Sequence, residues 1–203
     1  MHLNNDTQQR ILDAARELIY SRSYADVGVA DICEHAGVKK GSFYHFFPSK
    51  RDLTLSVIDT YYLQVKEHLV DKAFAEDIPP VARLERFGAL AYEFQKQLLK
   101  DTGRVLGCPF GNLSSELATQ DETIRIKLEE VFKKLQSSIR AVLREISATD
   151  KVHKLNIEAT AQAMLAYFEG VMLMAKNQNN AEVLRQLLPA MALIRITHPS
   201  SNS

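Results

Sequence analysis

Apolar residues recur every three or four positions along most of the chain, which is the spacing of one face of an α-helix. The first such stripe predicts a helix over residues 6–22 and consists of Ile11, Leu12, Ala15, Leu18 and Ile19. Two short helices are expected over residues 29–36 and 40–46, since Gly37 suits the end of the first and Pro48 stops the second.

Six further helices are expected later in the chain. Five of them cover about residues 50–72, 81–99, 121–146, 157–176 and 181–196. The sixth is a short helix that opens at residues 107–112 and ends near residue 118. Pro79 and Pro80 separate the first two of these, and Pro189 predicts a kink inside the last. The polar stretches 147–154 and 198–203 are expected to be a connection and a frayed tail. Strand-like alternation is rare and Gly and Pro are scarce, so the pattern predicts an all-α protein of about nine helices.

Composition and charge narrow the class of protein. The 203 residues are 46% hydrophobic and 25% charged, which is enough apolar mass for a core in one domain or two small ones. The net charge is zero, so a nucleic-acid partner would require a local basic patch. Two cysteines do not form a disulfide framework, and the chain has no secretion signal and no apolar run of 18 residues. We therefore expect a soluble cytoplasmic protein that does not contact a membrane.

A local basic cluster lies in residues 39–51, which carry Lys39, Lys40, Lys50 and Arg51 and no acidic residue. The two short helices, joined by a turn with Gly37 and crossed by the first helix, have the pattern of a helix-turn-helix. Such a module places the N-terminal end of its second helix in the major groove of DNA. The alternative is a solvated helix pair that carries lysines by chance.

Several residue types around the second short helix suit contacts with DNA. The candidates are Lys39, Lys40, Gly41, Ser42, Tyr44, His45 and Lys50. The lysines can pair with phosphates or guanine edges, and the absent side chain of Gly41 lets a DNA backbone approach. Ser42 and the free N–H groups of the first helical turn suit a phosphate oxygen. Phe43 and Phe47, four residues apart, are expected to anchor the helix on its inner side.

The same stretch resembles the signature of TetR-type transcriptional regulators. The resemblance rests on Asp31-Ile32, Ala36-Gly37-Val38, the run from Lys40 to Phe47 (Lys-Gly-Ser-Phe-Tyr-His-Phe-Phe) and Ser49-Lys50, and it covers about residues 8–55. It implies a homodimer with one DNA-reading head per subunit and a variable helical domain that binds an inducer. The implied domains are residues 1–51, a three-helix helix-turn-helix DNA-binding domain, and residues 52–203, a helical inducer-binding and dimerisation domain.

Carried over residue by residue, the DNA contacts of the family fall on the seven candidates above. Two positions depart from the usual family pattern. Val27 and Gly28 stand where the family has Thr-Ser, which removes a hydroxyl that caps the second helix and often touches a phosphate. Ser23 stands in place of a glycine in the preceding turn.

The helices after residue 52 offer apolar and aromatic residues that could line an inducer pocket. The candidates are Tyr61, Tyr62, Val65, Phe87, Leu90, Phe94, Phe110, Leu113, Phe132 and Met164, with Tyr167, Phe168 and Met172 as further possibilities. Each is also an ordinary core residue by type. Within this set we assign Tyr62, Phe94, Phe110, Tyr167 and Phe168 to the inducer site.

Cys108 is the sharper candidate for a sensor. Pro109 fits the first position of a helix, which makes Cys108 its N-cap, and a helix N-terminus stabilises a thiolate. With Lys176 near the end of a later helix, Gly107-Cys108 resembles the electrophile-sensing repressors of the TetR group, in which a thiol and a lysine are neighbours. The alternative is an unreactive residue in a turn. Cys33 is expected to be a buried core thiol.

The last two helices suit a dimer interface. Small residues recur in the first of them, at Ala159, Ala163, Ala166, Gly170 and Ala175. An apolar face continues on the second at Leu184, Leu187, Leu188, Met191, Ala192 and Ile194. Packing within one chain is the alternative, whereas a twofold dimer would match a palindromic operator.

The leading hypothesis is a ligand- or electrophile-responsive repressor that binds a double-stranded DNA operator and needs no cofactor. An inducer in the second domain would shift the helix that follows Lys50 and so change the spacing of the two heads. The alternatives are a helical small-molecule-binding protein and a Cys108-dependent enzyme, both without DNA activity. No zinc spacing, phosphate loop, di-metal Glu-x-x-His pair or nucleophile elbow favours an enzyme.

Overall fold

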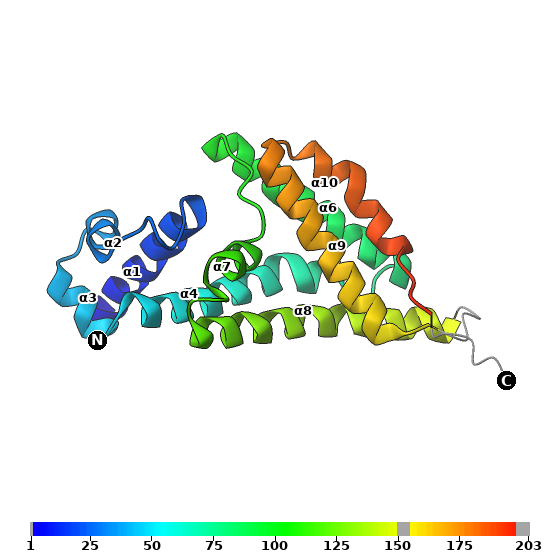
Figure 1. Ribbon diagram of the computed structural model, residues 1–203, viewed down its shortest axis with the longest axis horizontal. Coiled ribbons are helices and arrows are strands. Elements are labelled where there is room, and N and C mark those ends of the chain that lie inside the picture. Colours follow the sequence, from blue (N-terminus) through cyan, green and yellow to red (C-terminus); the bar gives the residue numbers. More distant parts are fainter. Residues whose placement is uncertain (1, 150–154, 198–203) are drawn as a thin grey trace. The chain divides into compact units, whose positions relative to one another are not determined.

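The computed structural model describes residues 2–149 and 155–197, and its secondary structure is helical apart from one isolated antiparallel bridge between Leu155 and Thr197 (Figure 1). The helices are α1 (His2–Ser21), α2 (Val29–Ala36), α3 (Lys40–Phe46), α4 (Lys50–Val65), the π-helical turn η1 (Lys66–Val70), α5 (Asp71–Ala73), α6 (Pro80–Thr102), α7 (Pro109–Leu117), α8 (Glu122–Thr149), α9 (Ile157–Gln178), α10 (Glu182–Leu187) and the 3₁₀ segment η2 (Leu188–Leu193). Of the expected connection and tail, residues 150–154 and 198–203 lie outside the described residues.

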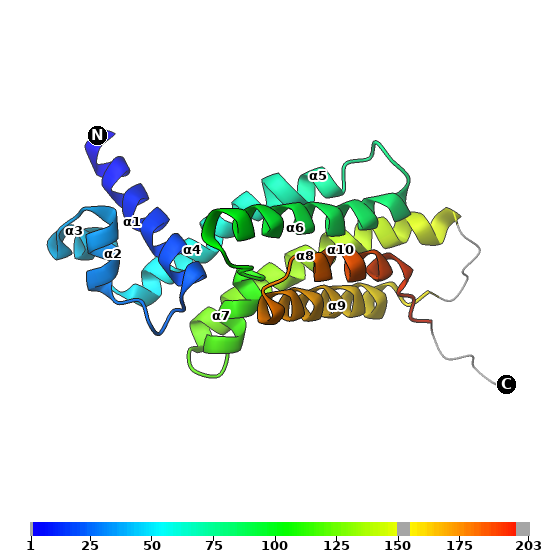
Figure 2. The ribbon, with the colours of Figure 1, turned by 90° about the horizontal axis from the view of Figure 1, so that it is seen from above.

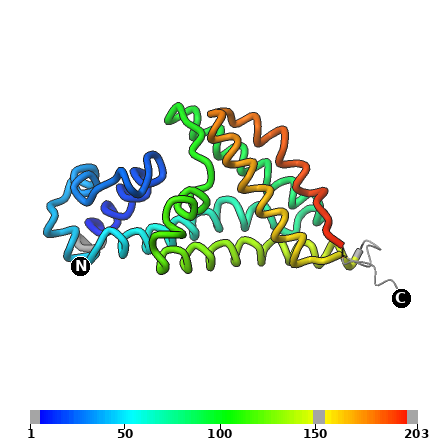
Figure 3. Tube along the Cα trace, in the orientation of Figure 1, coloured from blue at the N-terminus to red at the C-terminus, as the bar shows by residue number. Residues whose placement is uncertain are grey.

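The nine expected helical segments are present in the described part of the chain, with differences at their ends. α8 continues to Thr149, so residues 147–149, which were expected to belong to the polar connection, are helical. The last helical segment ends at Leu193 and not at residue 196. α1 begins at His2 and not at residue 6. The expected helix over 50–72 is a continuous helical run of α4, η1 and α5, which the trace in Figure 3 follows. Its π-helical turn is the wider form that interrupts α-helices locally. No helix among the described residues is long and apolar enough to span a membrane.

The expected kink at Pro189 takes the form of a change of helix type. α10 stops at Leu187, and Leu188–Leu193 continue as a 3₁₀ helix that has the proline in its first turn. Proline has no backbone N–H to donate to the preceding turn, so the α-helical hydrogen-bond pattern ends there. Ile194 then leaves the helix in an extended conformation.

The chain divides into two compact units that do not follow the sequence order. Unit 1 contains Met1–Gln64 and Pro109–Glu130, and unit 2 contains Val65–Cys108 and Val131–Ser203. Unit 1 therefore holds α1–α3, nearly all of α4, α7 and the first turns of α8. The boundary expected between residues 51 and 52 is a functional one and stays a prediction.

Within unit 1, α2 and α3 pack against α1 and against each other (Figure 1). The stripe on α1 is buried as the sequence predicts, with Ile11 and Ala15 at 0% exposure. Gly37 ends α2 in the left-handed conformation, at φ 64°, and its N–H donates to the Glu34 carbonyl at 3.1 Å. This turn fixes the direction in which α3 leaves α2.

Within unit 2, α6 packs against α10 and η2. α9 packs against α10, and the two helices lie side by side in both ribbon views (Figures 1 and 2). α6 and η2 approach closely at one glycine. A Cβ atom added at Gly88 would lie 2.9 Å from the Leu188 Cβ, closer than van der Waals contact allows. Gly88 thus sets how near the two helices can come.

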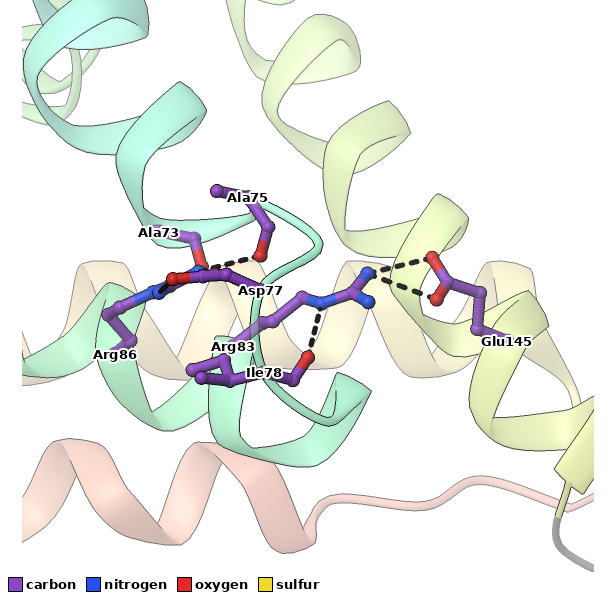
Figure 4. Close-up of polar contacts among 7 residues, drawn as sticks. All are labelled: Ala73, Ala75, Asp77, Ile78, Arg83, Arg86 and Glu145. Atoms are coloured by element: carbon purple, nitrogen blue, oxygen red, sulfur yellow. Dashed lines mark hydrogen bonds and ion pairs between the residues drawn. The ribbon is translucent and has the colours of Figure 1, made fainter.

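Two arginines fasten the loop between α5 and α6 (Figure 4). Arg83 is 6% exposed, and its Nη1 lies 3.0 Å from both carboxylate oxygens of Glu145 on α8, while its Nε donates to the Ile78 carbonyl at 2.9 Å. Arg86 donates to the carbonyls of Ala73 and Ala75 and pairs with Asp77. Charge-assisted hydrogen bonds of this kind are stronger than neutral ones, so the loop is held firmly on α6.

Replacing Arg83 by Met should lower the free energy of unfolding by about 2–3 kcal/mol, because Ile78 loses its donor and Glu145 its cation. Arg125→Met is the matched control, since Arg125 forms only exposed pairs with Glu122 and Glu129, worth about 0–1 kcal/mol. Urea unfolding followed by circular dichroism measures both. Equal losses in the two variants would contradict a special role for Arg83.

Candidate nucleic-acid interface and thiol site

The candidate DNA contacts of α3 lie on one accessible surface of unit 1. Lys39, Lys40, Gly41, Tyr44 and His45 are exposed, and Ser42 is half-buried. Lys39 precedes α3 in an extended conformation, so the first backbone N–H groups of the helix lie beside both lysines. The described structure thus groups six of the seven predicted DNA-binding residues.

The opposite side of α3 is anchored by aromatic residues, as the sequence predicts. Phe43 is fully buried and Phe47 is 4% exposed, and their ring centroids are 6.1 Å apart. The Tyr44 ring meets the Phe43 ring edge-on at 5.2 Å, yet Tyr44 remains 55% exposed. The contact with Phe43 therefore holds the Tyr44 ring in place while its hydroxyl group points to solvent.

Gly41 needs no special backbone geometry for the fold. A Cβ atom added there would meet nothing within 4 Å. The space beside Gly41 is open, so the residue type is not required by packing within the chain.

At the start of α2, the missing Thr-Ser pair is replaced by another cap. Gly28 is the N-cap, and its N–H donates to the Asp31 carboxylate at 2.7 Å. An acidic residue in the first turn also interacts favourably with the helix dipole. In the preceding turn, the Ser23 hydroxyl accepts the N–H of Asp26 at 3.1 Å. Gly28 itself offers no side-chain oxygen to the first N–H groups of α2, so the hydroxyl cap of the family pattern is absent here.

Lys50 differs from the other candidates because its ammonium is turned toward the chain. Nζ donates to the carbonyls of Tyr24 at 2.7 Å and Val27 at 2.9 Å, and lies 3.8 Å from the centre of the Tyr24 ring. Burial lowers the pKa of Lys50, and the charges of Glu116 and Asp31 oppose that shift. Its role as a phosphate contact stays a prediction, but it also fixes the α1–α2 loop to the start of α4.

The same loop is held from α7 by Glu116. The Glu116 carboxylate accepts the N–H of Tyr24 at 3.0 Å and the N–H of Ala25 at 2.6 Å. A second connection is aromatic, since the Tyr61 ring of α4 meets Tyr20 of α1 edge-on at 5.5 Å and Phe110 of α7 at 6.0 Å. α7, far along the sequence, is therefore part of the support of the candidate DNA-binding surface.

Cys108 follows a loop that is fixed from two helices. The Gln95 amide on α6 is fully buried, and it donates to the Gly107 carbonyl at 2.9 Å and accepts the N–H of Leu106 and of Gly107 at 3.1 Å. Asn179, at the end of α9, accepts the Val105 N–H at 2.8 Å. Gly107 has φ 75°, which a residue with a side chain adopts only at a cost. The position of Cys108 is therefore tightly determined.

Cys108 is 8% exposed and directly precedes Pro109, the first residue of α7. One of its contacts in unit 2 is Glu169 of α9. Burial raises the pKa of Glu169 to about 7, and a hydrogen bond with the Cys108 thiol acts in the opposite direction. The Glu169 Oε1 atom is buried and has no hydrogen-bond partner among the described residues. A thiol and a carboxyl group that is ionised only in part at neutral pH thus lie in contact.

The other predicted inducer residues are divided between the two units. Tyr62 and Phe110 belong to unit 1, whereas Phe94, Tyr167, Phe168 and Lys176 belong to unit 2. Phe168 is buried and stacks obliquely on Phe87 at 4.9 Å, and the Tyr167 hydroxyl donates to the Leu187 carbonyl at 2.9 Å. Phe94 is 48% exposed, and Lys176 is exposed in the last turn of α9. The inducer site therefore stays a prediction.

One cavity of about 270 Å³ is found in unit 2, beside the arginine cluster of Figure 4. Its lining is Val70, Asp71, Phe74, Glu76, Arg83, Ser138, Ala141, Val142 and Glu145. None of the predicted inducer residues contributes to this cavity.

Sequence reasoning missed three residues that organise these sites: Gln95, Glu116 and Glu169. The partners of Glu116 are 92 and 91 residues away, so no local pattern marks it. Gln95 and Glu169 are polar residues on helices that are otherwise read as amphipathic. The only signal in the sequence is their occurrence at inward positions of the helical repeat.

Comparison with known proteins gives consistent matches over both parts of the chain. The model described as "Bacterial regulatory proteins, tetR family" matches residues 11–57, and "Transcriptional regulator LmrA/YxaF-like, C-terminal domain" matches residues 80–188. An HTH-type transcriptional regulator of Lactococcus lactis subsp. lactis, in the lacX 3′ region, is 33% identical over 181 residues, which is 88% of each chain.

Two further proteins are similar over nearly the whole length. The HTH-type transcriptional repressor DhaR of Mycobacterium sp. (strain GP1) is 27% identical over 198 residues, 96% of each chain. The crystal structure of the regulatory protein TetR from Rhodobacter sphaeroides has a TM-score of 0.80 and 29% identity, and covers 93% of this chain and 98% of that one. These findings confirm the predicted fold, an N-terminal helix-turn-helix followed by a helical domain.

The raised pKa of Glu169 predicts a pH-dependent stability. The folded protein holds the Glu169 proton up to about pH 7, whereas the unfolded chain releases it near the ordinary pKa of 4.5. The folded state therefore binds more protons between these values, and its stability falls as the pH rises through this window. Glu169→Gln should stabilise the protein by on the order of 2–3 kcal/mol at pH 8 and by less than about 1 kcal/mol at pH 5.

Urea unfolding at the two pH values measures this difference. Glu34→Gln, at an exposed position of α2, is the control for the substitution itself. A gain in the Glu169 variant that is the same at both pH values would show that ionisation of Glu169 is not its cause.

Proposed function

We propose that this chain, which belongs to the TetR family of bacterial regulatory proteins, is a repressor that an electrophile releases from a palindromic operator. Membership of the family makes it a ligand-responsive DNA-binding transcriptional regulator. Repression, the identity of the inducer and the residues involved are the proposed part. A protein that acts on operator DNA would work in the bacterial cytoplasm.

One observation carries the DNA-binding assignment. Lys39, Lys40 and Tyr44 are exposed around the start of α3, while the buried Phe43 fixes the helix from inside. A helix of a helix-turn-helix reads the major groove with residues at this end, and lysines there bind phosphates or guanine edges. Since Gly41 is surrounded by open space, a phosphate backbone could approach α3 there.

The dimer that a palindromic operator requires has a suitable surface in unit 2. Leu173 and Met174 of α9 are 66% and 46% exposed, and Leu193 of η2 is 76% exposed. Exposed large apolar side chains, such as the adjacent Leu173 and Met174, are frequent at protein interfaces. A Cβ atom at Gly170 would meet nothing within 4 Å, so this part of α9 leaves room for a second helix.

The alternatives without DNA activity are not favoured. The relatives reported above are transcriptional regulators, and DhaR is described as a repressor. Neither a helical carrier nor a Cys108-dependent enzyme would need the exposed cluster at the start of α3.

The electrophile response is proposed from the position of Cys108. The thiol lies at the start of α7, next to a partly ionised carboxyl group, and the loop before it is held by Gln95. A covalent adduct at this residue would enlarge a buried side chain directly before α7, and α7 holds the α1–α2 loop through Glu116. Packed interiors do not absorb added volume without moving.

Lys39→Ala and Tyr44→Ala should each weaken operator binding by about 1–3 kcal/mol if the side chain meets a base edge or phosphate. A gel shift with the DNA upstream of the chain's own gene, repeated at several salt concentrations, measures the loss. Lys100→Ala is the control, because Lys100 is exposed on α6 of unit 2. Unchanged binding in both α3 variants would refute the assigned surface, and the absence of any salt-dependent shift would favour a carrier or an enzyme.

Cys108→Ser should abolish release from DNA by quinones, aldehydes or hypochlorite while leaving DNA binding in their absence intact. The serine hydroxyl retains the size of the group but is a poor nucleophile at neutral pH. Cys33→Ser is the control, as Cys33 is a buried thiol of α2 whose pKa burial raises. Release that persists in the Cys108 variant would rule out this thiol as the sensor.

A further inference from the structure

We propose that the cavity beside Arg83 binds a small uncharged compound through its carbonyl oxygen. The cavity, of about 270 Å³, lies within unit 2 and is lined by residues of η1, α5, the loop after α5, α6 and α8. Neither Cys108 nor any residue predicted for the inducer site lines it. The site therefore goes beyond the proposed electrophile response and does not depend on it.

Arg83 brings unused hydrogen-bond donors to this cavity. Its side chain is 7% exposed; Nε donates to the Ile78 carbonyl and Nη1 meets both carboxylate oxygens of Glu145, as Figure 4 shows. The remaining nitrogen, Nη2, forms no hydrogen bond with the described residues. Glu169 Oε1 is the one enclosed side-chain atom without a partner in the described chain, so Nη2 reaches accessible space. That space is the cavity which Arg83 lines.

The unused donors define the group that a ligand has to supply. Buried polar groups are nearly always hydrogen-bonded, so donors turned to a cavity are satisfied by water or by a ligand. A guanidinium group only donates, whereas a carbonyl oxygen only accepts and has two lone pairs for the two N–H bonds of Nη2. The hydroxyl of Ser138 lines the same cavity and offers one more donor. This set of donors matches a carbonyl oxygen.

The charges around the cavity favour an uncharged ligand. Its lining carries the carboxylates of Asp71, Glu76 and Glu145 against the single guanidinium of Arg83. Arg83 is already paired with Glu145, and Asp71 with Lys66 at 2.7 Å, so negative charge is in excess. An anion would be repelled by the carboxylates. A cation such as an amidinium has no lone pair to accept the N–H bonds of Arg83.

The rest of the lining is apolar and suits a hydrocarbon body. It consists of Val70, Phe74, Ala141 and Val142. The Phe74 ring is held in place, since it stacks on the Phe87 ring of α6 with a centroid distance of 5.4 Å and an angle of 13°. An apolar lining with a few placed polar groups is the usual composition of small-molecule sites. The volume is below the roughly 300–1,000 Å³ of sites for drug-sized ligands, which indicates a small ketone, ester or amide.

The backbone gives a second indication at the same place. The π-helical turn η1 ends at Val70, and α5 begins at Asp71, and both residues line the cavity. π-helical turns inside α-helices are rare and occur frequently at functional sites. The helix therefore departs from regular geometry where it forms the wall of the cavity.

The test measures the affinity of full-length protein for aromatic probes of the same size by NMR chemical-shift titration of the isotope-labelled protein. Acetophenone carries a carbonyl oxygen, and α-methylstyrene has a methylene group in its place. Benzoate is the matching anion and benzamidinium the matching cation. Acetophenone should bind at least about tenfold more tightly than each of the other probes, because it alone accepts from Arg83 without bringing a charge.

A matched pair of variants locates the binding. Ser138→Phe places an aromatic ring in the cavity and should weaken acetophenone binding at least about tenfold, because the ring occupies the space of the ligand. Ser137→Phe is the control, since Ser137 is exposed on α8 and does not line the cavity. It should bind acetophenone like the wild type.

Arg83→Lys tests the hydrogen bond separately from the space. Lysine keeps a positive charge for Glu145 but has no second terminal nitrogen to turn to the cavity. Acetophenone should therefore lose its preference over α-methylstyrene in this variant. Both ligands are compared in the same protein, so a loss of stability caused by the substitution does not produce this result.

The outcomes are distinct. Acetophenone binding that is equally tight in Ser138→Phe and in the wild type overturns the location of the site. Benzoate or benzamidinium that binds as tightly as acetophenone overturns the class of ligand, and a preference that survives Arg83→Lys overturns the role of Arg83. Absence of binding by every probe overturns the proposal as a whole. None of these results bears on release from operator DNA, which the Cys108→Ser experiment tests by itself.

Discussion

The candidate DNA-binding surface depends on the double hydrogen bond that Glu116 forms with the N–H groups of Tyr24 and Ala25. These groups lie in the α1–α2 loop, where no helix can satisfy them, and a carboxylate is the strongest acceptor a side chain offers. The orientation of α2, and through the Gly37 turn that of α3, follows from this loop. The Tyr20–Tyr61–Phe110 aromatic contacts add a second connection from α7, through α4, to α1. A helix that begins directly after Cys108 therefore supports the part of the chain that would read DNA.

Local patterns in the sequence were sufficient to predict most of the fold. α2 and α3 begin and end as expected, because Gly37 and Pro48 act on their own neighbours. Features that depend on tertiary contacts could not be predicted from the sequence in the same way. The π-helical turn η1 has no mark in the sequence. Pro189 marks the change to a 3₁₀ helix, but the close approach of Leu188 to Gly88 of α6 is visible only in the folded chain. The sequence also gives no sign that α7 belongs to the same compact unit as α1.

The candidate sites were predicted as residue types and not as contacts. The inner side of α3 could be anticipated because Phe43 and Phe47 are apolar and four residues apart. The spacing of Lys40 and Tyr44 does not set them apart from these two residues, so their exposure is a result of the fold. Glu169 could not, since only the folded chain brings it to the thiol of Cys108, and a charged residue type in a helix is usually solvated. The sequence singled out the thiol correctly as a residue at a helix start, but its acidic partner changes the chemistry expected of it.

The ammonium group of Lys50 has only three N–H bonds to share between the α1–α2 loop and a DNA phosphate. Two of its three N–H bonds serve the carbonyls of Tyr24 and Val27, and the ammonium lies over the Tyr24 ring, so a phosphate contact, which stays a prediction, would have to use the third. The ordering of the α1–α2 loop and the binding of a phosphate would then be thermodynamically linked, because both use the Lys50 ammonium. Burial of this ammonium is already costly, as its lowered pKa indicates. A signal that frees the loop would lower DNA affinity without displacing any residue of α3, and bound DNA would in return tighten the loop by the same free energy.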